Sequence, residues 1–114
     1  LNGLLGLDTL CVTVYQYRNS LTTVGGSVAG TTLTIPGGLL RQVLIRANTS
    51  TTVFRADLVD ENSITCLNYG YHRGELNDTG AHGGLPFPVA GEYTLNITNA
   101  SPNDTFSIVL GVQE

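Results

Sequence analysis

Residues 92–98, Glu-Tyr-Thr-Leu-Asn-Ile-Thr, and residues 105–112, Thr-Phe-Ser-Ile-Val-Leu-Gly-Val, decide the fold class. In both stretches every second side chain is apolar or aromatic. A period of two indicates a β-strand that buries one of its faces. Residues 99–104, which lie between them, are rich in turn formers, so we expect the two strands to form a β-hairpin.

The same alternation recurs along the rest of the chain, and no stretch sustains the 3.6-residue apolar period of a helix. Further strands are expected at residues 10–17, 31–35, 41–47, 53–59 and, with a weaker pattern, 63–69. Turn-forming residues separate them at 25–26, 36–38, 60–62 and 70–84. The sequence therefore predicts an all-β fold, an antiparallel β-sandwich or jelly-roll of seven to eight short strands.

The beginning of the chain has a different composition from the rest. Residues 1–7, Leu-Asn-Gly-Leu-Leu-Gly-Leu, would make a poor helix and at best a short strand. We therefore divide the chain into an apolar N-terminal arm, residues 1–9, and a single β-sandwich domain, residues 10–114. The arm is expected to bind a partner surface through Leu1, Leu4, Leu5 and Leu7. A frayed terminus or the end of a core strand would fit the same residues.

Composition and charge exclude several classes of function. Hydrophobic residues make up 41% of the 114 residues, enough for a core, whereas charged residues make up only 12%. The net charge is -4 and the cations are five scattered arginines, so the chain lacks the basic cluster that a nucleic-acid binder needs. No apolar run approaches the roughly 18 residues of a membrane span. A weakly charged surface favours a structural or binding role.

The candidate metal and calcium sites have simpler explanations. His72 and His82, together with a carboxylate, are possible zinc ligands, but their spacing matches no compact ligand pattern. We therefore expect this Gly-rich stretch to be a solvated loop. Asp57, Asp60 and Glu61 could bind Ca²⁺, yet the spacing of a calcium loop is absent and the same residues favour a hairpin turn. The sequence thus predicts no metal and no cofactor.

Catalytic motifs are missing as well. The chain contains no Gly-x-Ser-x-Gly elbow for a nucleophilic serine. Residues 25–30, Gly-Gly-Ser-Val-Ala-Gly, have the glycine content of a phosphate loop but no lysine follows them, so we expect a turn. We predict that the protein is not an enzyme.

Two features leave alternatives open. Cys11 and Cys66 could form a disulfide, or each could be a small core residue. Asn-x-Ser/Thr sequons, which are more frequent than chance predicts, begin at Asn48, Asn77, Asn96, Asn99 and Asn103. A secreted glycoprotein would explain them, and so would a β-surface rich in Thr and Asn, which we favour.

Two longer stretches resemble small virion proteins of tailed bacteriophages, cyanophages among them. They are residues 39–56, Leu-Leu-Arg-Gln-Val-Leu-Ile-Arg-Ala-Asn-Thr-Ser-Thr-Thr-Val-Phe-Arg-Ala, and the chain end from Phe87-Pro-Val-Ala-Gly-Glu-Tyr-Thr-Leu-Asn-Ile through Phe106-Ser-Ile-Val-Leu-Gly-Val-Gln-Glu114. The resemblance covers about half of the chain and rests on the general character of the sequence rather than on a diagnostic motif. It implies a β-sandwich that decorates or cements a capsid, or that forms part of a spike or fibre.

The end of the chain is also similar to the closing strands of secreted bacterial accessory domains of the pre-peptidase C-terminal type. In those domains a Gly-x-Tyr-Thr-Leu strand is followed by a second strand of aromatic and aliphatic residues, as at residues 91–95 and 106–112 here. They often carry acidic calcium-binding loops. The acidic residues of this chain are too dispersed for such loops, which weakens this alternative.

The resemblance leads to two hypotheses about function. The first is a capsid decoration (cement) protein on the capsid surface of the virion. It would bind the major capsid protein and self-associate, for instance as a trimer, and repetition in many symmetric copies would strengthen a modest interface. The second is a receptor- or glycan-binding module of a phage tail fibre or spike, or of a secreted bacterial protein. There Tyr69, Tyr71 and His72 could form an aromatic platform for sugar rings.

Overall fold

The computed structural model describes residues 14–99 and 103–114, which form β-strands and turns. The strands are, in chain order, β2 (Val14–Thr22), β3 (Val28–Ala47), β4 (Val53–Asp60), β5 (Thr65–Arg73), β6 (Glu75–Asp78), β7 (Phe87–Asn99) and β8 (Thr105–Gln113). Every paired neighbour among them is antiparallel. The predicted all-β antiparallel fold is confirmed. No helix that could cross a membrane occurs in the described part of the chain.

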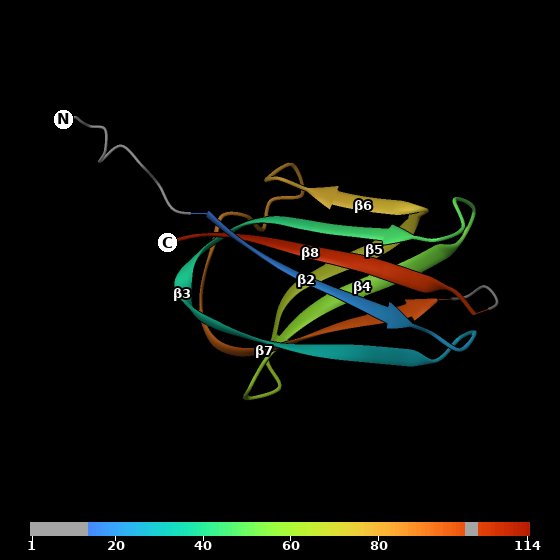
Figure 1. Ribbon diagram of the computed structural model, residues 1–114, viewed down its shortest axis with the longest axis horizontal. Helices are drawn as coiled ribbons and strands as arrows, with labels where there is room; N and C mark the ends of the chain where they lie inside the picture. The colour runs from blue at the N-terminus through green and yellow to red at the C-terminus, as the bar shows by residue number, and fades with distance from the viewer. Residues whose placement is uncertain (1–13, 100–102) are drawn as a thin grey trace.

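The long strand β3 connects two layers of one seven-stranded sheet (Figure 1). Its first part, residues 28–35, pairs with β7, whereas its last part, residues 39–47, pairs with β8. One layer therefore contains β2, β8, the end of β3 and β6. The other contains the beginning of β3, β7, β4 and β5. The sheet folds over itself at the register shift between Ile35 and Gly38 of β3 and has the two-layer arrangement of a sandwich.

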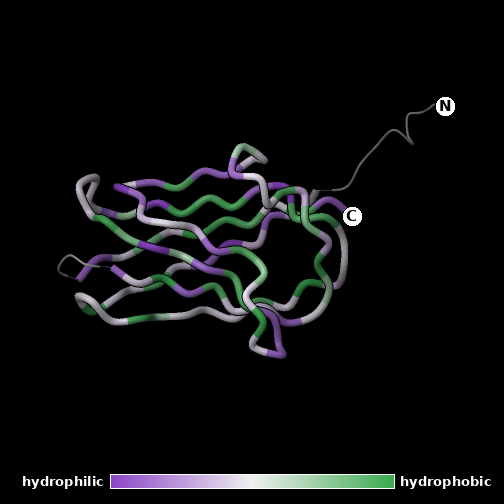
Figure 2. The backbone as a smooth tube through the Cα atoms, turned by 180° about the vertical axis from the view of Figure 1, so that it is seen from behind, coloured by the Kyte–Doolittle hydropathy of each residue, from purple (hydrophilic) through white to green (hydrophobic). Residues whose placement is uncertain are grey.

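The core lies between the two layers and is aliphatic apart from a few aromatic rings. Phe54 of β4 and Phe106 of β8 are both fully buried, and their rings meet edge to face at 5.1 Å although the two strands do not pair. Alternate residues on β4, β5, β7, β8 and the end of β3 enter this core, whereas β2 packs the partly buried Tyr17 and Leu21 against it. Figure 2 shows the matching alternation of hydrophobic and hydrophilic residues. The fully buried aliphatic side chains include Ile35, Leu40, Ile45, Leu58, Leu76, Leu95, Ile97, Ile108 and Leu110.

Glycines allow the chain to pass between the layers at two positions. Gly38, in the bend of β3, has a φ of 145°, and a Cβ there would lie 2.5 Å from the backbone oxygen of Gln113. Gly74, between β5 and β6, has a φ of 77°, and a Cβ there would lie 2.5 Å from the backbone oxygen of Ser50. Side chains rarely adopt this conformation. Both crossings therefore depend on residues without a Cβ.

The expected hairpin between residues 92–98 and 105–112 is wrong. β7 pairs with β3 and β4, whereas β8 pairs with β2 and β3, so the two strands lie in different layers. The buried Asp104, just before β8, stabilises this arrangement. Its carboxylate accepts hydrogen bonds from the Thr52 hydroxyl at 2.6 Å and the Thr49 amide at 3.0 Å. These bonds attach the start of β8 to the turn between β3 and β4.

Two other boundaries differ from the expectation. Residues 31–35 and 41–47 belong to one strand, because the break at residues 36–38 bends β3 without ending it. Within the predicted loop 70–84, residues 75–78 form β6, a short edge strand paired with β3. The turn at Gly25–Gly26 is confirmed, with a hydrogen bond from the Ser27 amide to the Val24 carbonyl. Leu1, Leu4, Leu5 and Leu7 of the proposed arm lie outside the described residues.

Candidate functional site

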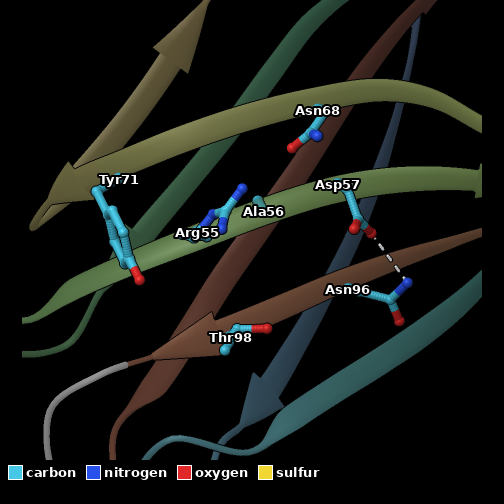
Figure 3. Close-up of a pocket in the computed structure, with 7 residues that line it drawn as sticks. All are labelled: Arg55, Ala56, Asp57, Asn68, Tyr71, Asn96 and Thr98. Atoms are coloured by element: carbon cyan, nitrogen blue, oxygen red, sulfur yellow. Dashed lines mark hydrogen bonds between the residues drawn. The ribbon is translucent and has the colours of Figure 1, made fainter.

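A polar pocket of about 240 Å³ opens on the outer face of the layer that contains β4, β5 and β7. Figure 3 shows side chains from the three adjacent strands gathered around it. The residues that line it are Arg55, Ala56 and Asp57 of β4, Asn68 and Tyr71 of β5, and Asn96 and Thr98 of β7. We refer to these seven residues as the outer-face pocket.

Strand alternation places most of these side chains on the outside. Phe54, Ala56 and Leu58 of β4 are buried, so Arg55 and Asp57 between them face outward. The same rule turns Asn96 outward from β7, whose Leu95 and Ile97 are buried. In each case the hydrophobic residues fix the orientation of the polar ones.

Tyr71 reaches the outer face because of a β-bulge in β5. Phe54 is opposite His72 and Ala56 is opposite Tyr69, so β5 has one residue more than β4 in this interval. The extra residue turns Tyr71 outward, where it is 63% exposed, and returns His72 to the side of buried Phe54. The expectation that Tyr69, Tyr71 and His72 share one platform is therefore wrong. Of the three, only Tyr71 lines the outer-face pocket.

The pocket contains two contacts that each involve one charged side chain, and polar side chains that form no hydrogen bond within the described part of the fold. Asn96 donates a hydrogen bond of 3.0 Å to Oδ1 of Asp57 (Figure 3). The guanidinium carbon of Arg55 lies 5.3 Å from the ring centroid of Tyr71, a cation–π contact. Among the described residues, no side-chain hydrogen bond engages Asn68 or Thr98. The pocket thus offers donors and acceptors for a polar ligand next to an exposed aromatic ring.

A second cluster lies on the inner side of the same layer, near its β5 edge. Tyr69 donates a hydrogen bond of 2.7 Å to Oδ2 of Asp78, which is fully buried. Oδ1 of Asp78 accepts from the Gly80 amide at 2.9 Å and lies 3.3 Å from Nδ1 of His82. The rings of His82 and His72 are 5.5 Å apart. Both histidines line a cleft of about 370 Å³, which we call the histidine cleft.

The environment of the histidine cleft shifts the pKa of two of its groups. Burial, followed by the hydrogen bond and the negative charge of Asp78, raises the pKa of the Tyr69 phenol, which therefore stays protonated. Burial also disfavours ionisation of Asp78. Hydrogen bonds from Tyr69, Gly80 and His82 outweigh that effect and lower the pKa of Asp78 below its usual 3.8. Asp78 is thus an ionised acceptor at neutral pH.

The structure separates the other acidic candidates. Asp57 bonds to Asn96, whereas Oδ1 of Asp60 accepts from the amides of Asn62 and Ile64 at 2.9 Å each. Residues 60–62 thus form the predicted turn. Within residues 14–99 and 103–114, no three His, Cys, Asp or Glu side chains are grouped closely enough to hold a metal ion together.

The cysteine alternatives stay open. Cys66 is half-buried on β5, and Cys11 lies outside the described residues. Burial raises the pKa of the Cys66 thiol, and the nearby charge of Asp60 raises it further. At neutral pH the unpaired side chain would therefore be a thiol rather than a reactive thiolate.

Comparison with known proteins finds no matching family model and no matching curated sequence. Among solved structures, the chain is similar to the enzymatically active domain of tailspike protein 4 of bacteriophage CBA120. The two are 17% identical with a TM-score of 0.36, and the alignment covers 90% of this chain and 18% of the tailspike chain. The chain thus spans less than a fifth of that protein's length, and a likeness this distant identifies no family.

Proposed function

We propose that this protein is a non-enzymatic binding module of a bacteriophage virion, and that its outer-face pocket takes a saccharide of the host surface. The observation that carries the proposal is the position of Tyr71. Its exposed ring stands beside a pocket whose other side chains are nearly all polar. The setting in a virion is supported by the resemblance of residues 39–56 and 87–114 to small phage virion proteins.

The lining of the pocket fits the chemistry of a sugar. A sugar ring has an apolar side of C–H groups that packs on an aromatic face, and an edge of hydroxyls that both donate and accept hydrogen bonds. Tyr71 supplies the aromatic face, with Arg55 against its ring. Asp57, Asn68 and Asn96 supply planar acceptors and donors for the hydroxyls. A hydrophobic ligand would instead leave these polar groups without partners, at a cost in free energy.

The size of the pocket also favours a small ligand. Its volume of about 240 Å³ lies below the ~300–1,000 Å³ typical of pockets for drug-sized molecules. It suits one ring of a surface glycan better than an enclosed cofactor. A single weak site of this kind becomes effective when a virion carries many copies, because multivalent attachment raises the apparent affinity.

A glycan array probed with the protein on a multivalent carrier tests the proposal. The wild type should bind a limited set of glycans, and Tyr71→Ala should reduce that signal at least tenfold. Tyr15→Ala is the matched control, because Tyr15 is another exposed tyrosine, on β2 of the other layer. Binding that survives Tyr71→Ala, or that Tyr15→Ala removes equally, would contradict the proposed site. Inertness across host glycans would contradict the function.

Capsid decoration stays a prediction, because Leu1, Leu4, Leu5 and Leu7 lie outside the described residues. The same holds for binding to the major capsid protein and for self-association. Particles stripped of the protein should be less stable to heat and low salt than intact particles if it acts as a cement. Re-addition of a chain that lacks residues 1–9 should then fail to restore stability. Stripped particles that survive as well as intact ones would exclude this role.

A further inference from the structure

The histidine cleft brings together two imidazoles that are ten positions apart in the sequence. His72 belongs to β5, and His82 follows β6 in the loop before β7. Their ring centroids are 5.5 Å apart, and the rings are tilted by 55°. Phe54 and Tyr69 flank the His72 ring, each with its centroid 6.4 Å away, and Tyr69 also contacts His82 edge to face at 5.8 Å. Neighbouring aromatic rings thus hold both imidazoles in place.

Each histidine has one ring nitrogen engaged by a group that can only accept a hydrogen bond. Nδ1 of His72 lies 3.0 Å from the carbonyl oxygen of Gly70, and Nδ1 of His82 lies 3.3 Å from Oδ1 of Asp78. In the neutral rings, Nδ1 must therefore carry the proton and donate it. The lone pair of each imidazole is then on Nε2, for which no hydrogen bond is found within the described residues.

This arrangement is the one that supports metal-binding histidines. A metal-bound imidazole almost always donates its other N–H to a carboxylate or a backbone carbonyl, which fixes its tautomer and its orientation. Here Gly70 does this for His72, and Asp78 does it for His82. Asp78 is itself held by Tyr69 at 2.7 Å and by the Gly80 amide at 2.9 Å. The supporting contacts for both candidate ligands are therefore already formed.

We propose that the histidine cleft binds a divalent ion from the late first-row transition series, such as Ni²⁺ or Zn²⁺, through Nε2 of His72 and Nε2 of His82. Imidazole nitrogen is a preferred ligand for these metals. No third His, Cys, Asp or Glu of the described residues completes the site, so water fills the remaining coordination positions. The cleft, with about 370 Å³ of space, has room for that water.

Isothermal titration of the whole chain with Zn²⁺ or Ni²⁺ alone tests the proposal. The wild type should bind one ion per chain, and His72→Gln and His82→Gln should each lower the affinity at least tenfold. Cys66→Ser is the matched control, because Cys66 lines the same cleft but is not a proposed ligand, and its affinity should equal that of the wild type. Thermal melts without metal should show that both histidine variants are folded.

NMR of ¹⁵N-histidine-labelled protein gives a readout that does not depend on affinity. Addition of Zn²⁺ should shift the Nε2 resonances of His72 and His82 strongly and leave both Nδ1 nitrogens protonated. Three results would overturn the site: no binding of either ion at millimolar concentration, equal binding by the glutamine variants, or coordination through Nδ1. Loss of binding in Cys66→Ser would move the site to the thiol and would also overturn it.

Discussion

The hydroxyl of Tyr69 donates a 2.7 Å hydrogen bond to the buried carboxylate of Asp78, and this bond connects β5 to the end of β6. β6 pairs with β3, in the layer opposite to that of β5. The bond therefore joins the two layers at the edge where only a short strand covers the core. It also positions the carboxylate that holds His82.

Removal of the Tyr69 hydroxyl should destabilise the fold. In Tyr69→Phe, Oδ2 of the buried Asp78 loses its partner, so we expect the free energy of unfolding to fall by about 1–3 kcal/mol. Urea unfolding followed by circular dichroism measures this. Tyr71→Phe is the matched control, because the Tyr71 ring is exposed. The free energy of unfolding of this variant should fall by less than about 0.5 kcal/mol. Equal losses in the two variants would contradict the structural role of the bond.

Acid should destabilise the protein through Asp78 and Asp104, the two buried carboxylates of the described residues. Hydrogen bonds from Thr52, Thr49 and Thr105 overcome burial and lower the pKa of Asp104 below 3.8, as those around Asp78 do for that group. The unfolded chain then binds protons at higher pH than the folded chain does. The stabilisation is therefore complete above about pH 5 and is lost as the pH falls from about 4 through the folded pKa.

Urea unfolding of the wild type and of Asp104→Asn at pH 7, 4 and 3 checks this expectation. The variant should be less stable at pH 7, and its stability should fall less between pH 7 and 3. A variant with the same pH dependence as the wild type would show that Asp104 is not one of the groups responsible.

Replacement of Gly38 should test the bend in β3. Gly38→Ala combines an unfavourable φ of 145° with a Cβ 2.5 Å from the backbone oxygen of Gln113. Gly37→Ala is a close control, because Gly37 has a φ of 154° and no atom within 4 Å of the added Cβ. We expect Gly37→Ala to cost at most about 1–3 kcal/mol from backbone strain alone. Gly38→Ala should cost clearly more in thermal or urea unfolding, and equal costs would contradict the close approach.

Replacement of Gly30 should disturb the outer-face pocket without unfolding the protein. A Cβ at Gly30 would lie 2.5 Å from Oδ1 of Asn96, so the Asn96 side chain must shift, and its hydrogen bond to Asp57 is disturbed. Glycan binding should therefore weaken in Gly30→Ala, while the melting temperature should stay within a few degrees of that of the wild type. Gly70→Ala is the control, because a Cβ at Gly70 meets no atom within 4 Å. Unchanged binding in Gly30→Ala would argue against a role for Asn96.

Strand alternation in the sequence was enough to predict the fold class and much of the core. Leu95, Ile97, Phe106 and Ile108 are buried as their spacing indicates, because a pleated strand places every second side chain on the same face. Alternation says which face of a strand is buried but not which strand lies beside it. The expected hairpin between β7 and β8 was wrong for that reason. Strand pairing depends on contacts between distant residues, such as those of Asp104 with Thr49 and Thr52.

Neither candidate site could be predicted without the tertiary structure, for related reasons. The bulge that turns Tyr71 outward and His72 inward leaves no signal in the local pattern, because it exists only relative to the register of β4. The spacing of His72 and His82 matches no metal motif, yet the bend at Gly74 and the short strand β6 bring the two rings together. Thus the sequence alone determined that this chain forms β-strands with one buried face. The packing of two layers decided which polar side chains come into contact, because those contacts depend on strand pairing between residues far apart in the chain.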